Sequence, residues 1–245
     1  MTTGTRCPWL AALLGSILVI PTAVAALLPA TFVIQQAELR WKEASSLVVD
    51  REVTRQDAGG AFHERVWWRG GRIRVDGPHG AWVYAIGRPS PAVDHRPGII
   101  DAIFLTPQGQ LERLVRNMGV DLDSVALDRI PRADGSLPFD VIYRLGNTAR
   151  RSAPHIEITK DTWTIRALQF SDPIDGHLWR AEYDGHGRSS LLPPWLPTHI
   201  LVFRDGMLFE SVRVLRLVDM PVPMSLFDVP AGSGQAPRNT STDEQ

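Results

Sequence analysis

Glu64-Arg-Val-Trp-Trp-Arg-Gly-Gly-Arg-Ile-Arg-Val-Asp76 is the stretch that decides the fold of this chain. Two runs of β-prone residues meet at Gly70-Gly71, and glycine accepts the positive φ angles that a two-residue hairpin turn needs. With this turn, the opposing residues on one side of the hairpin are all apolar: Val66 with Val75, and Trp68 with Ile73. The pattern therefore predicts an antiparallel hairpin whose apolar side covers a core.

The other side of this hairpin is charged. The same register opposes three further pairs there: Arg65 with Asp76, Trp67 with Arg74, and Arg69 with Arg72. We expect an Arg65–Asp76 ion pair and a cation–π contact between Arg74 and Trp67. A shift of the register by one residue would bury these charges, so the register is strongly specified.

Length and composition limit the class of protein. A chain of 245 residues can form one large β domain or two small ones, and 44% hydrophobic with 22% charged residues indicates a globular protein. The net charge of −1 argues against nucleic acid as a partner, because phosphate binding needs a concentrated cationic surface. The 7 histidines are scattered without metal-ligand spacing, and no Gly-x-Ser-x-Gly elbow or phosphate loop occurs. We expect no metal, no cofactor and no enzymatic activity.

The first 25 residues are typical of a secretory signal peptide. Arg6 precedes a long apolar run, and Ala23-Val24-Ala25 provides the small residues of a cleavage site. A retained membrane anchor is the alternative, because no charge occurs between Arg6 and Glu38. Cys7, the only cysteine, lies before the apolar run, where a lipidated cysteine would not lie. Cleavage would leave a cysteine-free domain over 26–230 in the periplasm, followed by a disordered tail over 231–245.

The mature chain starts with a helix and a strand meander. Helical spacing of Val33, Ala37, Trp41 and Ala44 predicts a helix over Leu28–Ala44. Strands are expected over Leu47–Arg55 and Ala81–Ala85, on either side of the hairpin. The proline-rich segment Gly87–Gly98 then breaks the pattern. Short helices are expected over Ile99–Leu105 and Gln108–Met118, the second ending at Gly119.

The rest of the chain alternates like strands. Strands are expected near 139–145, 155–160, 163–170, 178–183, 198–203 and 207–218. Asp205-Gly206 makes a second hairpin turn. This last hairpin is apolar on both faces and should be covered on both: Ile200, Val202 and Phe209 against Leu201, Phe203, Leu208 and Val212. Leu226-Phe227 is the last apolar anchor. Together these elements predict an α+β fold, with a single curved antiparallel sheet of roughly ten strands.

This order of elements resembles the LolA/LolB-like superfamily of periplasmic lipoprotein-sorting proteins. The resemblance covers about residues 28–230 and rests on layout: the leading helix up to Trp41-Lys-Glu-Ala-Ser-Ser, the hairpin over 66–75, the strand Trp82-Val-Tyr84, and the closing Leu196-Pro-Thr-His-Ile … Asp205-Gly206 … Val222-Pro-Met-Ser-Leu-Phe227. It implies an unclosed β-barrel with helices covering its concave face, and an acyl-binding cavity between them. The superfamily's lid-holding arginine corresponds to Arg74, or alternatively Arg72. The insertion at Gly87–Gly98 departs from dedicated lipoprotein carriers.

The resemblance and the apolar pattern together predict a non-enzymatic, monomeric periplasmic carrier of lipids or acylated lipoproteins in outer-membrane biogenesis. The predicted ligand-binding residues lie on the sheet and on the second helix: Val66, Trp68, Ile73, Val75, Trp82, Tyr84 and Trp179, with Leu111, Leu114, Val115 and Met118 as the cover. An inner- or outer-membrane protein would be the delivery partner. Two alternatives stay open. One is a periplasmic sensor domain of envelope state, and the other is an envelope hydrolase using Asp94, His95 and Asp101.

Overall fold

The computed structural model describes residues 27–39, 46–56, 59–78, 80–85, 103–104, 106, 109–131, 139–150, 152–172, 176–187 and 192–228. Several sequence predictions lie outside these residues. They are the signal peptide with Cys7, Trp41 and Ala44 of the first helix, the Gly87–Gly98 insertion with Asp94 and His95, Asp101, and the tail over 231–245.

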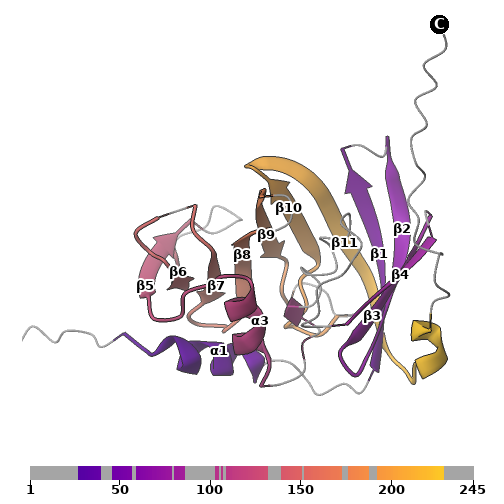
Figure 1. The fold of residues 1–245 in the computed structure, drawn as a ribbon, viewed down its shortest axis with the longest axis horizontal. Coiled ribbons are helices and arrows are strands. Elements are labelled where there is room, and N and C mark those ends of the chain that lie inside the picture. Colours follow the sequence, from indigo (N-terminus) through magenta and orange to yellow (C-terminus); the bar gives the residue numbers. More distant parts are fainter. Residues whose placement is uncertain are drawn as a thin grey trace, which may run out of the picture.

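The described residues form one antiparallel sheet of 11 strands in the order β4-β3-β2-β1-β11-β10-β9-β8-β7-β6-β5. Two helices and a 3-10 helix accompany it: α1 (Ala30–Glu38), α3 (Leu111–Asn117) and η1 (Met224–Phe227). The strands are β1 (Ser46–Arg55), β2 (Ala61–Arg69), β3 (Arg72–Gly77), β4 (Gly80–Ala85), β5 (Val125–Ile130), β6 (Asp140–Gly146), β7 (His155–Thr159), β8 (Ile165–Ser171), β9 (Leu178–Asp184), β10 (His199–Arg204) and β11 (Met207–Asp219). Figure 1 shows the sheet curving around α1 and α3.

The register of the β2–β3 hairpin is the predicted one. Val66 pairs with Val75 and Trp68 with Ile73, across a turn in which Gly70 and Gly71 have φ angles of 55° and 77°. All four apolar side chains are buried. The predicted fold class is thus confirmed at this hairpin, because its apolar side lies on the inside of a curved sheet.

The charged side of the hairpin has other partners than the sequence suggested. Arg65 bonds Asp50 of β1 at 2.6 Å, and Arg74 bonds Asp76 of its own strand at 2.6 Å. Trp67 donates its indole N–H to Asp76, and its ring lies below the guanidinium of Arg65. The expected pairing overlooked β1, because it considered only the two strands of the hairpin.

Three β-bulges account for the curvature of the sheet. The register shifts at Asp50/Arg51 against β11, at Val202/Phe203 against β11, and at Glu157/Ile158 against β8. In each case the partner strand contains one extra residue, and an extra residue bends its strand and increases the local twist. The sheet therefore closes partway around its apolar face without joining β4 to β5.

Both helices are shorter than predicted and lie on the concave side. α1 buries Val33, Ile34 and Ala37 against the sheet. α3 ends where Gly119, at φ 83°, donates to Arg116 while the Val120 N–H reaches the carbonyl of Val115. This is a Schellman ending, as the glycine indicated. In the predicted segment Ile99–Leu105, the structure describes Ile103 and Phe104, which are helical and buried.

Two strand predictions needed correction. β5 was missed, because its residues Val-Ala-Leu-Asp-Arg-Ile are at most half-buried and it pairs only with β6 among the described strands. The last hairpin is not covered on both faces. Ile200, Val202 and Val212 are buried, whereas Leu208 is exposed. The bulge at Val202/Phe203 shifts the alternation, so Val212 lies with Ile200 and not with Leu201.

The end of the described chain packs on the convex side, opposite the helices (Figure 1). Phe227 and Val222 form a small cluster with Val48 of β1. Arg69 and Arg74 donate to the carbonyls of Val222 and Leu226 at 2.5 and 2.7 Å. The expected apolar anchor at Leu226-Phe227 is confirmed, and it holds the end of the described chain against the convex side of β1–β3.

A buried carboxylate on the convex face makes stability depend on pH. Burial alone would raise the pKa of Glu157, but a hydrogen bond from His155 and the charges of Arg180 and Arg144 lower it from 4.5 to about 2. Because its pKa is lowered in the folded state, the ionised carboxylate stabilises the fold above about pH 4.5. This stabilisation is lost as the pH falls toward 2. We expect Glu157→Gln to cost about 3 kcal/mol at pH 7 and almost nothing at pH 2. Urea unfolding of both proteins across this range measures the difference, and a constant difference would contradict the assignment.

Candidate functional site: the concave face and its cover

The concave face is a continuous apolar surface. Side chains from nine of the described strands line it in one buried cluster, including Val49, Val66, Ile73, Leu145, Ile156, Leu168, Trp179, Val202 and Val214. No second sheet covers it in the part of the chain that the structure describes. Its cover consists of α1, the Ile103-Phe104 segment, α3 and the loop 192–197.

A buried carboxylate joins the two covering helices. Glu38 ends α1 and accepts the backbone N–H of Leu111, the first residue of α3, at 2.6 Å. A carboxylate is favourable at a helix N-terminus, where backbone N–H groups lack partners inside the helix. Because this bond is buried, displacing one helix alone would leave polar groups without partners. The two helices are therefore expected to move together.

Aromatic contacts and one histidine attach the cover to the sheet. Phe32 of α1 meets Trp163 edge to face at 6.4 Å, and Phe104 meets Tyr183 of β9 at 4.6 Å. The two ring nitrogens of His186 lie 3.1 and 3.0 Å from the carbonyls of Trp195 and Ile165, which ties the loop 192–197 to β8. Burial lowers the pKa of His186, against the effect of the two carbonyls.

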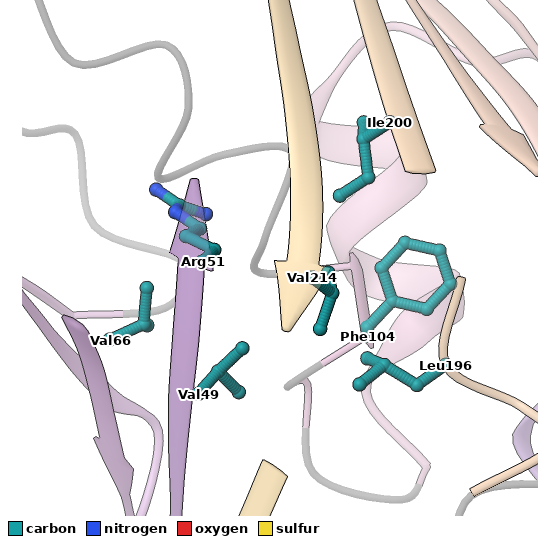
Figure 2. A pocket seen from close by; sticks show the side chains of 7 residues that line it. All are labelled: Val49, Arg51, Val66, Phe104, Leu196, Ile200 and Val214. Carbon is teal, nitrogen blue, oxygen red and sulfur yellow. The ribbon is translucent and has the colours of Figure 1, made fainter. Parts of the chain in front are cut away.

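A small apolar gap remains between strands β1, β2, β10 and β11 and the cover. It is about 20 Å³, and Figure 2 shows its lining: Val49, Arg51, Val66, Phe104, Leu196, Ile200 and Val214. Such a gap has room for about one water molecule. Around this gap, the side chains of the described part of the cover fill the concavity. An acyl chain could enter this part only where these side chains leave.

Two ion pairs lie on the same concave face, one buried and one half-buried. Arg51 of β1 bonds Glu64 of β2 at 2.6 Å, with side-chain exposures of 3% and 6%. Arg55 bonds Glu210 of β11 at 2.7 Å. Arg51 also lines the gap, so a guanidinium with a paired carboxylate borders the apolar space (Figure 2).

The face contains buried polar atoms that the described residues leave unsatisfied. Trp68 Nε1 and Glu210 Oε1 have no hydrogen-bond partner among those residues. Burial raises the pKa of the Glu210 carboxyl, against the attraction of Arg55. A binding pocket for an amphiphile combines an apolar lining with a few polar groups, and this face has that composition.

The structure brings most of the predicted binding residues together. Val66, Trp68, Ile73, Val75, Leu111, Leu114, Val115 and Trp179 belong to one buried cluster, with Trp82 and Met118 packed against it. Tyr84 pairs with Ile73 in the register, and its side chain is not described. Arg74 lies on the convex face with η1, and Arg72 is exposed at the hairpin end. The guanidinium that borders the gap belongs to Arg51.

Sequence reasoning missed Arg51, Glu64 and Glu38. The alternation Leu47, Val49, Arg51, Val53 in β1 contained a signal, since residues two apart share a face of a strand. Glu38 had no such signal, because only the tertiary structure brings it to Leu111. Among the described residues, no group of three potential ligands could hold a metal ion. In the same part of the chain, no helix has the length and apolar character needed to cross a bilayer.

Comparison with solved structures finds distant similarities, all with TM-scores below 0.5. A LolA superfamily protein from Nitrosomonas europaea is 12% identical, with 82% of this chain and 98% of that chain covered and a TM-score of 0.45. A domain assigned to outer membrane lipoprotein sorting from Vibrio parahaemolyticus is 9% identical, with 80% and 95% covered and a TM-score of 0.48. A DUF1329 family protein from Desulfovibrio piger is 13% identical, with 82% and 97% covered and a TM-score of 0.42.

No family model matches the chain, and no curated protein matches its sequence. The described residues form one unclosed antiparallel sheet with helices on its concave side. This architecture is the fold class that the sequence predicted. At identities of 9–13%, the similarity concerns the fold and transfers no function.

Proposed function

We propose that this protein is a non-enzymatic periplasmic carrier of lipids or acylated lipoproteins, which binds acyl chains on its concave face. One observation carries the proposal. Among the described residues, a continuous apolar face is covered by two short helices, the Ile103-Phe104 segment and a loop, and not by a second sheet. These helices have only 9 and 7 residues, which is short compared with a face lined by most strands of the sheet.

The energetics allow the cover to exchange with a ligand. Burying one methylene contributes about 0.8 kcal/mol, so a sixteen-carbon chain gains on the order of 12 kcal/mol before costs. Opening the cover and losing the freedom of the ligand offset much of this gain. An empty apolar cavity is itself costly. The packed cover is therefore the expected ligand-free state, with Leu111, Leu114 and Val115 in the space that the acyl chain would occupy.

The test is retention of a fluorescent fatty acid by Leu114→Asp. Leu114 is buried beneath α3, and a carboxylate there should oppose both the closed cover and the bound chain. We expect retention to fall at least tenfold. Asn117→Asp places the same charge on the exposed side of α3 and should change little. Unchanged retention by a folded Leu114→Asp protein would remove the helix from the site.

Leu114→Ala and native mass spectrometry keep the proposal falsifiable if Leu114→Asp fails to fold. Leu114→Ala enlarges the space under the helix and should change fatty-acid affinity. Protein purified from its own envelope should contain co-purifying lipid. A lipid-free mass together with no fatty-acid binding by the wild-type protein would overturn the carrier proposal. If His95→Ala then abolished a hydrolytic turnover, the hydrolase alternative would take its place.

A further inference from the structure

Arg204, at the end of β10, differs from Arg51 and Arg55 on the same concave face. Those two arginines are each bonded to a glutamate. Arg204 is half-buried, and its guanidinium forms no hydrogen bond or ion pair with another described residue. The carboxylate of Asp205, next to it in the chain, lies 2.6 Å from Nδ1 of His177 instead. The N–H donors of Arg204 are therefore not used by an acid in the described part of the chain.

Two aromatic rings hold the guanidinium of Arg204 in place. It lies 6.0 Å from the ring centre of Trp179 and 5.0 Å from that of Phe209, and these two rings meet edge to face at 5.2 Å. Arg204 is opposite Trp179 in the register of β9 and β10, so both side chains point to the concave side. A cation–π contact positions a guanidinium and leaves its N–H groups free to donate.

The β-bulge between β10 and β11 brings one of these rings to the concave side. Val202 of β10 pairs with Glu210, and the pairing then shifts by one residue, so Phe209 is the extra residue of β11. Strict alternation would point Phe209 away from the side of Glu210. Phe209 instead packs on Trp179 and against the buried cluster of the concave face. A bulge can re-aim a side chain in this way, and here it places a ring beside Arg204.

The concave side of β10 is apolar at one end and cationic at the other. Ile200, Val202 and Arg204 alternate along it, because residues two apart share a face of a strand. Ile200 lines the small gap beneath Phe104 (Figure 2). Arg204 lies four residues further along the strand, which is about 13 Å. A molecule with a long apolar chain and an anionic end matches this order.

We propose that Arg204 binds the anionic headgroup of an acyl-chain ligand, a carboxylate or a phosphate, whose chain lies along the concave side of β10. This inference rests on the proposed carrier function and narrows the ligand to anionic amphiphiles. A guanidinium can donate two parallel N–H groups to a carboxylate or a phosphate. Because Arg204 is half-buried beside aromatic rings, water screens such a pair less than on an open surface. A hydroxyl headgroup has no charge and forms a weaker contact.

Competition between ligands of equal chain length tests the headgroup site. A fluorescent fatty acid bound to the purified chain is displaced at pH 7 by dodecanoate, dodecyl phosphate or dodecanol, and each constant is corrected for the affinity of the probe. We expect the wild-type protein to bind both anions about tenfold more tightly than the alcohol. Arg204→Gln should abolish most of this preference. Arg204→Lys keeps the charge and should keep part of it.

Arg213→Gln is the matched control for the loss of one positive charge. Arg213 lies on β11 between two residues of the concave side, so its side chain points to the convex face, where it is 56% exposed. This variant should keep the wild-type preference. An equal loss of preference in Arg204→Gln and Arg213→Gln would assign the effect to net charge and overturn the site.

The remaining outcomes separate the headgroup site from the carrier function. Equal binding of all three ligands by the wild-type protein would overturn the site and leave the carrier proposal standing. An equal loss of affinity for the anions and the alcohol in Arg204→Gln would give Arg204 a purely structural role and contradict the site. Binding of none of the three ligands would contradict the carrier function and the headgroup site together.

Discussion

Arg51→Met is expected to lower the free energy of unfolding by about 3–5 kcal/mol. The substitution leaves Glu64 as a buried carboxylate without its guanidinium partner, next to the small apolar gap that residue 51 lines. Desolvation of that charge is no longer offset, so the fold must tolerate it, protonate it or open. Urea unfolding at pH 7 measures the loss.

The adjacent pair in the same two strands provides a matched control. Asp50 pairs with Arg65 in the register next to Arg51 and Glu64, and both ion pairs have a separation of 2.6 Å. The side chains of Arg65 and Asp50 are 52% and 27% exposed, because they point to the convex face. Arg65→Met should therefore cost less than about 1 kcal/mol. Equal losses in the two single variants would show that burial does not decide the value of the pair.

The double variant Arg51→Met/Glu64→Leu separates stability from function. Replacing both buried charges by apolar residues should recover most of the stability lost in the single variant. If the ion pair also orients the polar end of a bound amphiphile, the stable double variant should still retain fatty acid less well than wild type. Full stability with full retention would restrict the pair to a role in folding.

Gly146→Ala is the second substitution with a large expected effect. Gly146 ends β6 at φ 131°, and a Cβ there would lie 2.5 Å from the carbonyl oxygen of Pro154 and 2.9 Å from the Cα of His155. Both atoms belong to the backbone and cannot rotate away, so β6 and β7 would have to separate. We expect a loss of about 3 kcal/mol or more, from the overlap and the unfavourable backbone conformation.

Gly60→Ala is the matched control for this substitution. A Cβ at Gly60 meets no atom within 4 Å, and its φ is outside the left-handed region. Its unfolding midpoint in urea should stay within the range of neutral surface changes. A similar loss in both variants would contradict the attribution to the overlap with Pro154 and to the positive φ of Gly146.

Local sequence was sufficient for the β2–β3 hairpin and for the end of α3. The Gly70-Gly71 turn sets which residues face each other, and alternation then assigns each side chain to one face. Gly119 likewise marks the end of α3 through a local hydrogen-bond pattern. These features depend on residues within a few positions of one another, so the pattern alone could predict them.

The sequence pattern could not predict which strands far apart in the chain pair with each other. The pairing of β1 with β11 contains the bulge at Asp50/Arg51, and the small gap lies beside Arg51 at this position. Likewise, Arg65 bonds Asp50 of β1 instead of Asp76. A bulge depends on which strand arrives as the neighbour, and the partner strand is more than 150 residues away in the sequence.

The sequence by itself determined the class of fold, the apolar face of the sheet and most of the residues on it, because period-two alternation and turn glycines act locally. The tertiary structure decided what covers that face. It placed Glu38 on the first N–H of α3, paired Arg51 with Glu64 beneath the cover, and packed η1 against Arg74 on the charged side of the hairpin. These contacts join residues far apart in the chain, and their position follows from the curvature of the whole sheet.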